Sequence, residues 1–317
     1  MKELSYSEDI LRYGFEQYTI NLKDDYEGHA VATLIRRNTS SYQGKAILYI
    51  HGFNDYFFQQ ETAIAFNNKG YNFYALDLRK YGRSLLPHQK MNDIRNLRSY
   101  YEEIAKALDI IHSEDNKEVI LFGHSTGGLI LTLFAKEHPD SPLFDGVMLN
   151  SPFFDFNKKP IIKRLIPIFS ALGKLFPGIK INGGFSKEYG MNLHKEYSGE
   201  WNYNLEWKPN TAPRINLGWL RAIYRAQQLL QKQFTITHPV LILHSSQSTN
   251  NYTDKEQMQT MDSILNVRDI ARMANKINGN VEVTAIEGGI HDLVLSKKNI
   301  REQVYDTIFT WLKKQNL

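Results

Sequence analysis

Short apolar runs alternate with amphipathic stretches along most of this chain. Eight runs are rich in β-branched and aromatic residues and are bounded by Gly, Asn, Asp, Ser or His, which is typical of β-strands. The first two surround a polar turn and have the spacing of a hairpin, whereas the other six have the apolar character of buried strands. These runs are residues 15–22, 29–35, 46–50, 72–76, 119–122, 147–149, 240–243 and 281–286.

Stretches with apolar residues at helical spacing lie between these runs. Strands that alternate with helices favour a parallel sheet covered by helices over an all-β or all-α fold. The sequence therefore predicts an α/β fold with a mostly parallel, eight-stranded sheet and flanking helices. The predicted helices are residues 59–69, 97–112, 126–136, 267–277 and 299–313.

One interval, residues 151–238, breaks this rhythm. It has no convincing strand, but it is rich in Pro, Gly and aromatic residues and holds two basic helical stretches, at 161–175 and 215–234. A loop of this length without structure of its own is implausible inside a compact domain. We therefore expect a core made of residues 1–150 and 239–317, with residues 151–238 inserted as a helical cap.

The composition is that of an ordinary globular protein. Of the 317 residues, 42% are hydrophobic and 23% are charged, and the net charge of +4 comes without a dense basic tract, which argues against nucleic acid as a partner. The absence of cysteine excludes disulfides, a thiolate nucleophile and Cys-ligated metal sites. The chain shows no signal-peptide pattern and no run of 18 apolar residues, so we expect a soluble cytoplasmic protein.

The most specific chemical signal is the sequence Gly-His-Ser-Thr-Gly at residues 123–127, between a predicted strand and a predicted helix. A serine on such a turn points its hydroxyl out above the sheet, and the glycines relieve the crowding around its strained backbone. The helix N-terminus favours negative charge, and the amide of Thr126 can face the oxyanion of a tetrahedral intermediate. We therefore interpret Ser125 as a nucleophile. The alternative is a glycine-rich turn with a capping serine.

A second motif, His51-Gly52-Phe53, follows the predicted strand 46–50. A second oxyanion donor is needed from the loop after this strand. The backbone amide of Phe53 fits that role, because Gly52 allows a close approach of the backbone. His51 precedes the serine in the chain, so we interpret it as a residue that braces the loop rather than as a catalytic base.

These motifs resemble the α/β-hydrolase superfamily and, within it, the branch of monoacylglycerol lipases and lysophospholipases of serine aminopeptidase S33 type. Residues 51–53 resemble the oxyanion turn of that branch, 77–84 its Asp-x-Arg-x-x-Gly-x-Ser stretch and 123–127 its nucleophile elbow, and Ser151-Pro152 resembles the start of its cap. The similarity extends from about Ala46 to the C-terminus. It implies a serine hydrolase whose triad follows the chain order serine, acid, histidine.

Five histidines follow Ser125, and His291 is the best candidate for the base. It lies in the loop between the predicted strand 281–286 and the final predicted helix. A histidine in that loop can reach over the edge of the sheet to the serine hydroxyl, take its proton and return it to the leaving group. The other four have structural interpretations at a helix end, in the cap or beside a strand: His138, His194, His238 and His244.

The triad acid of the resembled family follows the strand that corresponds to residues 240–243. A direct extension of that alignment places Ser248 where a carboxylate is expected, and a polar insertion, residues 245–260, surrounds it. The next residues resemble the family's Asp-x-Val-Val-Pro run, so we choose Asp262 as the carboxylate that would hold the imidazole tautomer. Two alternatives are Asp254 in the insertion and Asp269 in the following helix.

The remaining acids and histidines have simpler interpretations. Asp77 ends a strand beside Arg79 and Arg83, which favours a structural ion pair, and Asp292 is expected to anchor the loop of His291. No metal site is indicated, because the histidines form no i, i+4 pair with a carboxylate and thiol ligands are absent. We expect no cofactor.

The first cap helix carries an apolar face with basic residues nearby. This face can present apolar walls to an acyl chain and basic residues to a membrane surface. The favoured alternative is packing on the core, because Pro160 and Pro167 interrupt the pattern and one basic stretch binds a membrane weakly. The apolar residues are Ile161, Ile162, Leu165, Ile166, Phe169, Leu172 and Phe176, and the basic ones are Lys158, Lys159, Lys163, Arg164 and Lys174.

Together these features predict a serine hydrolase that cleaves a carboxylic ester through an acyl-enzyme, with Ser125, His291 and Asp262 as its triad. The expected substrate is an acyl lipid, such as a monoacylglycerol or a lysophospholipid, or a small acyl ester. A peptidase or amidase with the same triad, or a ligand-binding member of the fold without catalysis, is the alternative. An epoxide or haloalkane hydrolase would need aspartate in place of Ser125.

Overall fold

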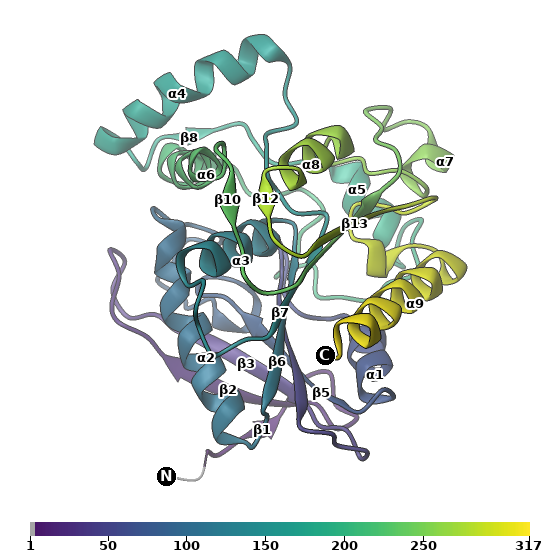
Figure 1. The fold of residues 1–317 in the computed structure, drawn as a ribbon. Coiled ribbons are helices and arrows are strands. Elements are labelled where there is room, and N and C mark those ends of the chain that lie inside the picture. The colour runs from purple at the N-terminus through teal and green to yellow at the C-terminus, as the bar shows by residue number, and fades with distance from the viewer. Residues whose placement is uncertain (1–3) are drawn as a thin grey trace.

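A nine-stranded sheet runs through the computed structural model, which describes residues 4–317 (Figure 1). The strand order is β1-β2-β3-β5-β4-β6-β7-β11-β13. Strands β1, β2, β3 and β5 pair antiparallel, and all pairings from β5 through β4 to β13 are parallel. The bounds are β1 Ser7–Glu8, β2 Glu16–Asn21, β3 Val31–Arg37, β4 Lys45–Ile50, β5 Tyr71–Asp77, β6 Glu118–His124, β7 Gly146–Asn150, β11 Val240–Ser245 and β13 Val281–Ile286.

The predicted α/β class is confirmed, and all eight predicted strands form. The ninth, β1, was not predicted. It consists of two exposed polar residues at the sheet edge, which is too short for any alternation of apolar and polar positions to show in the sequence.

Helices cover both faces of the sheet and bury an apolar core on each side. In Figure 1, α2 and α3 lie on one face, and α1 and α9 lie on the other. The apolar residues of α2 and α3 belong to one buried cluster, and those of α1 and α9 belong to a second. The bounds are α1 Gln60–Asn67, α2 Tyr101–Ser113, α3 Thr126–Glu137, α7 Lys255–Met258, α8 Val267–Ala274 and α9 Lys298–Gln315, with single turns η1 Gly82–Ser84, η2 Leu97–Tyr100 and η3 Leu293–Leu295.

Five parallel strands, β4, β6, β7, β11 and β13, all end at the same edge of the sheet, because parallel strands share one direction. The loops that follow β4, β6, β11 and β13 carry every site residue predicted from the sequence. Residues far apart in the chain are therefore brought together at this edge.

The segment 151–238, which we call the cap segment, lies between β7 and β11 and holds three helices, α4 Pro160–Leu175, α5 Lys187–Leu193 and α6 Leu217–Leu229. The expectation that it contains no strand is wrong in detail. Two-residue strands β8 Lys180–Ile181 and β9 Ile215–Asn216 pair with each other, and β10 Phe234–Thr235 pairs with β12 Ile277–Asn278. Pairs this short leave no periodic pattern in the sequence.

Helix α4 lies at the outside of the molecule and rests on α6 (Figure 1). It is held there by Ile166, Ser170 and Gly173, which are its buried residues. A side chain at Gly173 would collide with the carbonyl oxygen of Leu217, so glycine allows the two helices to cross closely. The apolar face of α4 does not pack on the core as expected, because most of its large apolar side chains are exposed.

No helix among residues 4–317 combines the length and the apolar character that a membrane crossing requires.

Candidate active site

Ser125 lies on a tight turn between β6 and α3, as its motif predicts. Its backbone has φ of +51°, a region in which a non-glycine residue is strained. The turn closes against β4, because a side chain at Gly127 would collide with the backbone carbonyls of Ile50 and His51. The Ser125 amide donates to the carbonyl of Asn150, which fixes the turn on β7 at 2.9 Å. This geometry raises the Ser125 hydroxyl above the carboxyl edge of the sheet.

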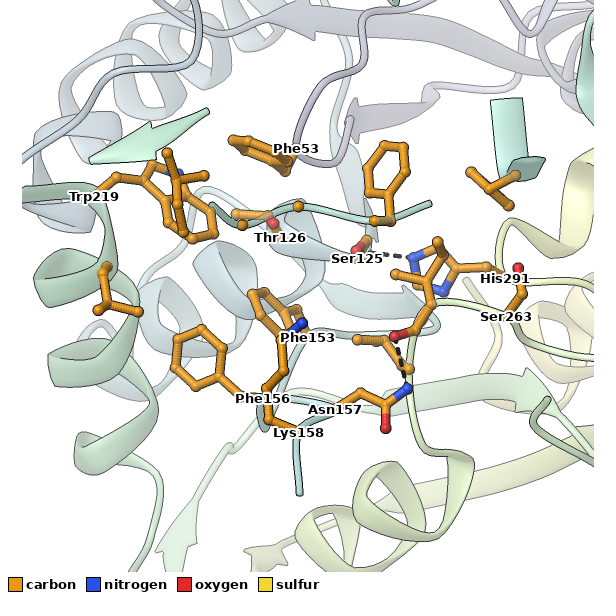
Figure 2. Close-up of a pocket in the computed structure, with 18 of the residues that line it drawn as sticks. Phe53, Ser125, Thr126, Phe153, Phe156, Asn157, Lys158, Trp219, Ser263 and His291 are labelled. Atoms are coloured by element: carbon orange, nitrogen blue, oxygen red, sulfur yellow. Dashed lines mark hydrogen bonds between the residues drawn. The ribbon is translucent and has the colours of Figure 1, made fainter. Parts of the chain in front are cut away.

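His291 reaches Ser125 from the loop after β13. Its Nε2 lies 3.0 Å from Ser125 Oγ, and both side chains are almost fully buried. Figure 2 shows the two side chains pointing toward each other across one side of a pocket. A neutral imidazole with its proton on Nδ1 accepts the serine hydroxyl proton at Nε2 in this arrangement.

Asp262 occupies the other side of the imidazole. Its Oδ2 lies 2.9 Å from His291 Nδ1, and the residue is fully buried. Its Oδ1 accepts hydrogen bonds from the amides of Ile264 and Leu265, each at 2.8 Å. The carboxylate therefore has fixed partners on both oxygens, and the imidazole ring is held in one orientation.

Neither alternative carboxylate bonds His291. Asp254 caps the short helix α7 by accepting from the amides of Glu256 and Gln257. Asp269 pairs with Lys163 and Arg272 on the surface. The structure thus brings Ser125, His291 and Asp262 together and places the other two acids in structural roles.

The two backbone amides predicted to hold an oxyanion flank the serine. Phe53 and Thr126 both line the pocket beside Ser125 (Figure 2). Gly52 allows this approach, since a Cβ atom there would lie 3.1 Å from Ser125 Cβ. Within residues 4–317, no hydrogen-bond acceptor is bonded to the amide of Phe53 or of Thr126.

His51 braces the loop that carries Phe53. Its Nε2 accepts from the amide of Leu78 at 3.1 Å, and its Nδ1 lies 2.8 Å from the carbonyl oxygen of Gly52. Burial lowers the pKa of His51, which keeps the ring neutral and suits one nitrogen that accepts and one that donates. His51 forms no hydrogen bond with the Ser125 hydroxyl, whereas His291 does. Its position therefore agrees with the expected role of bracing the loop.

A pocket of about 340 Å³ is lined by Ser125 and His291. Its walls come from both the core and the cap segment, and most of its lining side chains are apolar or aromatic. In Figure 2 the aromatic rings of Phe53, Phe153, Phe156 and Trp219 lie on the side of the pocket away from His291. Helix α4 contributes Ile162, Ile166 and Phe169 to the wall.

The family comparison agrees with this geometry. Residues 43–298, most of the chain, match the family model described as serine aminopeptidase, S33. The chain belongs to this family. It is therefore a hydrolase with the α/β-hydrolase fold, as the resemblance of its motifs implied. A search of curated protein sequences gives no match.

Several solved structures share the fold of this S33-family hydrolase. A soluble variant of monoglyceride lipase from Saccharomyces cerevisiae, in complex with a substrate analogue, is 17% identical with a TM-score of 0.67, over 94% of this chain and 96% of that one. Monoacylglycerol lipase from Paleococcus ferrophilus is 18% identical with a TM-score of 0.65, over 89% of this chain and 99% of that one. Est1E from Butyrivibrio proteoclasticus, with ferulic acid bound, is 17% identical with a TM-score of 0.57, over 90% of this chain and 96% of that one.

The S33-family hydrolase also has a buried polar network beside His291 that the sequence did not reveal. Asp55 lines the pocket and pairs with Lys208 of the cap segment, with 2.7 Å between Oδ1 and Nζ. Asp292 accepts hydrogen bonds from Asn150 and Gln59. The expected role of Asp292 as an anchor fits these bonds. No local motif marks Lys208, because it reaches Asp55 from a part of the chain 153 residues away.

Asp55, His124 and Asp292 offer three ligand atoms within 4.8 Å of one another. The ammonium group of Lys208 already balances Asp55, and two side-chain amides occupy the oxygens of Asp292. Burial lowers the pKa of His124 and so disfavours a positive charge on its ring. Both oxygens of Asp292 are thus bonded within the protein, which supports the His291 loop, whereas Oδ2 of Asp55 is buried without a hydrogen-bond partner among residues 4–317.

Of the two ion pairs expected for Asp77, the structure contains the one with Arg83 but not the one with Arg79. Arg83 binds Asp77 at 2.9 Å, and it also binds Asp9. Arg79 instead pairs with Glu102 and Glu103 of α2. The sequence could not distinguish these partners, because both arginines follow Asp77 closely while the glutamates come from a distant helix.

Proposed function

We propose that this S33-family hydrolase cleaves carboxylic esters with Ser125 as nucleophile, His291 as general base and acid, and Asp262 as the residue that orients the imidazole. The observation that carries the proposal is the continuous pair of hydrogen bonds, 3.0 Å from Ser125 to His291 and 2.9 Å from His291 to Asp262, beneath an apolar pocket. Residues arranged in this way act as a unit in acyl transfer.

The reaction has two halves. His291 Nε2 takes the proton of Ser125 Oγ as the oxygen attacks the ester carbonyl, and the amides of Phe53 and Thr126 donate to the oxyanion. The imidazolium then gives its proton to the leaving alcohol, and an acyl-enzyme remains. Water attacks that ester with the same base, and Ser125 regains its proton when the acid leaves.

The pocket supports an acyl ester as the substrate. A cavity of about 340 Å³ lined largely by apolar and aromatic side chains accommodates an acyl or aryl chain next to Ser125. We therefore propose an acyl lipid, such as a monoacylglycerol or a lysophospholipid, or a small acyl ester. The monoglyceride lipases among the structural neighbours share the fold that holds such a pocket.

A peptidase is the second candidate, because the family carries the description of a serine aminopeptidase. An aminopeptidase must bind the positively charged amino terminus of its substrate, which requires a carboxylate that is not already paired with a cation. Asp55 is the carboxylate that lines this pocket, and Lys208 neutralises it at 2.7 Å. Lys158 adds a further positive charge to the lining. This balance favours an ester with a neutral or anionic group over a peptide.

We also propose that the cap segment makes weak contact with a lipid surface through α4. Large apolar side chains form one exposed face of this helix, including Ile161 at 63%, Ile168 at 58% and Leu175 at 71% exposure. Basic residues flank the face, which suits an anionic lipid surface, and Ile162 and Phe169 of the same helix reach the pocket. A lipid-bound helix would thus place the pocket entrance at the surface that holds the substrate.

A substrate panel tests the proposal. Purified protein is assayed with short-chain aryl esters, monoacylglycerols, lysophospholipids and aminoacyl arylamides, with Ser125→Ala as the control. Ester hydrolysis that is lost in the variant supports the proposal. Turnover of arylamides without ester turnover would assign the peptidase function, and no turnover together with no labelling by a fluorophosphonate would assign a ligand-binding role.

A further inference from the structure

A second pocket, of about 510 Å³, lies between the core and the cap segment and is lined by four arginines. It is formed where η2, α3 and α6 meet, away from Ser125. Arg95 and Arg98 come from the core, and Arg221 and Arg225 lie one helical turn apart on α6. Two positions four residues apart share one face of a helix, so both side chains line the same pocket.

The positive charge of this pocket is largely uncompensated. Arg98 is neutralised by Glu137, with bonds of 2.6 and 2.8 Å. Arg221 donates one bond to the carbonyl oxygen of Ser170, which carries no charge. Arg95 lies over the ring of Tyr26, with 3.6 Å to its centre. Within residues 4–317, no carboxylate is paired with Arg95, Arg221 or Arg225.

The rest of the lining defines what fits beside the arginines. The side-chain amides of Asn96 and Gln228 add polar groups, and Leu97, Leu133 and Ala226 form a buried apolar floor. Guanidinium groups match the oxygens of a phosphate group in geometry and in charge, and several of them together favour a dianion over a single carboxylate. An apolar floor accommodates a small apolar part of the same ligand.

We propose that this arginine pocket, lined by Arg95, Arg98, Arg221 and Arg225, binds a phosphate group, either as a free phosphate compound or as the head of a lipid phosphate. A ligand held by Arg95 of the core and by Arg225 of α6 ties the cap segment to the core. Helix α6 also places Trp219 and Leu220 in the wall of the ester pocket. Phosphate binding on one side of α6 therefore stabilises the position of this helix, whose other side forms part of the ester pocket wall.

Binding is tested by titration calorimetry with three probes: inorganic phosphate, inorganic pyrophosphate, and dihexanoyl phosphatidic acid kept below its micelle concentration so that it stays monomeric. The wild type is compared with the double variant Arg95→Gln/Arg225→Gln. The matched control is Arg268→Gln/Arg12→Gln, which removes the same charge from exposed residues outside the pocket. We expect the pocket variant to weaken binding about tenfold or more, and the control to change it less than about threefold.

Hydrogen exchange locates the bound ligand. Pyrophosphate or the lipid phosphate is expected to slow the exchange of amides in α6 and in residues 95–100, and this protection should vanish in the pocket variant. Preference for pyrophosphate over the lipid phosphate, or the reverse, identifies the source of the group. Absence of binding by all three probes, equal weakening in the two variants, or protection elsewhere in the chain would overturn the proposal. None of these readouts depends on ester hydrolysis.

Discussion

Asp262 and Ser248 lie side by side in a short parallel bridge, although residues 249–261 separate them in the chain. The Asp262 amide donates to the carbonyl of Gln247, and the Asp262 carbonyl accepts from the amide of Thr249. The inserted loop therefore leaves and returns at one point. It brings the carboxylate of Asp262 next to Ser248, which occupies the position where the family alignment expects the acid. The Ser248 hydroxyl accepts a hydrogen bond from the amide of Val267 at the start of α8.

Replacing Asp262 with asparagine tests this arrangement. The amide oxygen can still accept from Ile264 and Leu265, but the amide nitrogen cannot accept a hydrogen bond from His291 Nδ1, so the imidazole is held in the wrong tautomer. We expect kcat for an aryl ester to fall by about 10³ to 10⁴. Asp254→Asn, in the same insertion, is the control and should leave kcat within about twofold. A loss of less than about tenfold in Asp262→Asn would remove Asp262 from the mechanism.

Gly52→Ala separates catalysis from folding. A Cβ atom at this position would lie 3.1 Å from Ser125 Cβ and 3.2 Å from His124 Cδ2, so the loop must shift by a few tenths of an ångström. That shift moves the Phe53 amide away from the oxyanion. We expect kcat to fall by about 10- to 100-fold while KM changes little, because the interaction is made in the transition state. Urea unfolding should show a small change in stability. An unchanged kcat would mean that the Phe53 loop contributes no oxyanion donor.

The buried imidazole of His51 makes stability depend on pH. Its pKa is lowered by burial, so on acidification the unfolded chain takes up the proton first, and stability is lost as the pH falls below about 6.5, the ordinary histidine value. We expect the free energy of unfolding, measured with urea, to fall between about pH 7.5 and pH 5, by up to about 1.4 kcal/mol per pH unit for each such histidine. His124, whose pKa is also lowered by burial, adds to this loss.

His51→Gln should reduce the pH-dependent loss without abolishing it, since His124 remains. His88→Gln, at an exposed position, is the control and should keep the wild-type slope. If His51→Gln and the wild type lose the same free energy between the two pH values, His51 is not the neutral brace that the structure indicates.

The exposed face of α4 predicts a selective effect on lipid substrates. Ile168 belongs to that face and does not line the pocket, so Ile168→Glu should leave hydrolysis of a soluble aryl ester unchanged. Sedimentation with anionic vesicles should show about tenfold weaker binding, because an apolar side chain no longer enters the lipid surface. The control is Ala171→Glu, which adds the same charge at an exposed position of α4 without removing a large apolar side chain, and its effect should be smaller. Equal vesicle binding by the two variants would argue against lipid contact through this face.

Much of the fold follows from patterns that the sequence displays openly. Runs such as Val119–Phe122 and Val147–Leu149 are continuous and apolar because the central strands are buried on both faces. The two-residue strands β1, β8 and β10 escape detection, since two residues carry no periodicity. The exposed face of α4 was also misjudged, because an apolar stripe in sequence looks the same whether it packs on a core or stays in solvent.

Site residues on strongly constrained turns were the easiest to predict. Ser125 sits in a motif in which each glycine has a steric reason, and His291 follows the last strand of the sheet. The triad acid was harder to predict, because Asp262 follows an insertion. Backbone hydrogen bonds to Gln247 and Thr249 bring Asp262 back beside the strand end, and no local sequence pattern specifies these bonds. Lys208 and the arginine pocket were not predicted, because both join the cap segment to the core through long-range contacts. The proposed division into core and cap, and the cytoplasmic location, stay predictions.

The most direct test of the central claim is mass spectrometry of the intact protein after reaction with a fluorophosphonate, followed by peptide mapping. Ser125 held at 3.0 Å from His291 should form a single covalent adduct on the peptide that contains residue 125. Ser125→Ala should stay unlabelled, and His291→Gln should label far more slowly. An adduct on another residue, or labelling of Ser125→Ala at the wild-type rate, would contradict the assignment of Ser125 as the nucleophile.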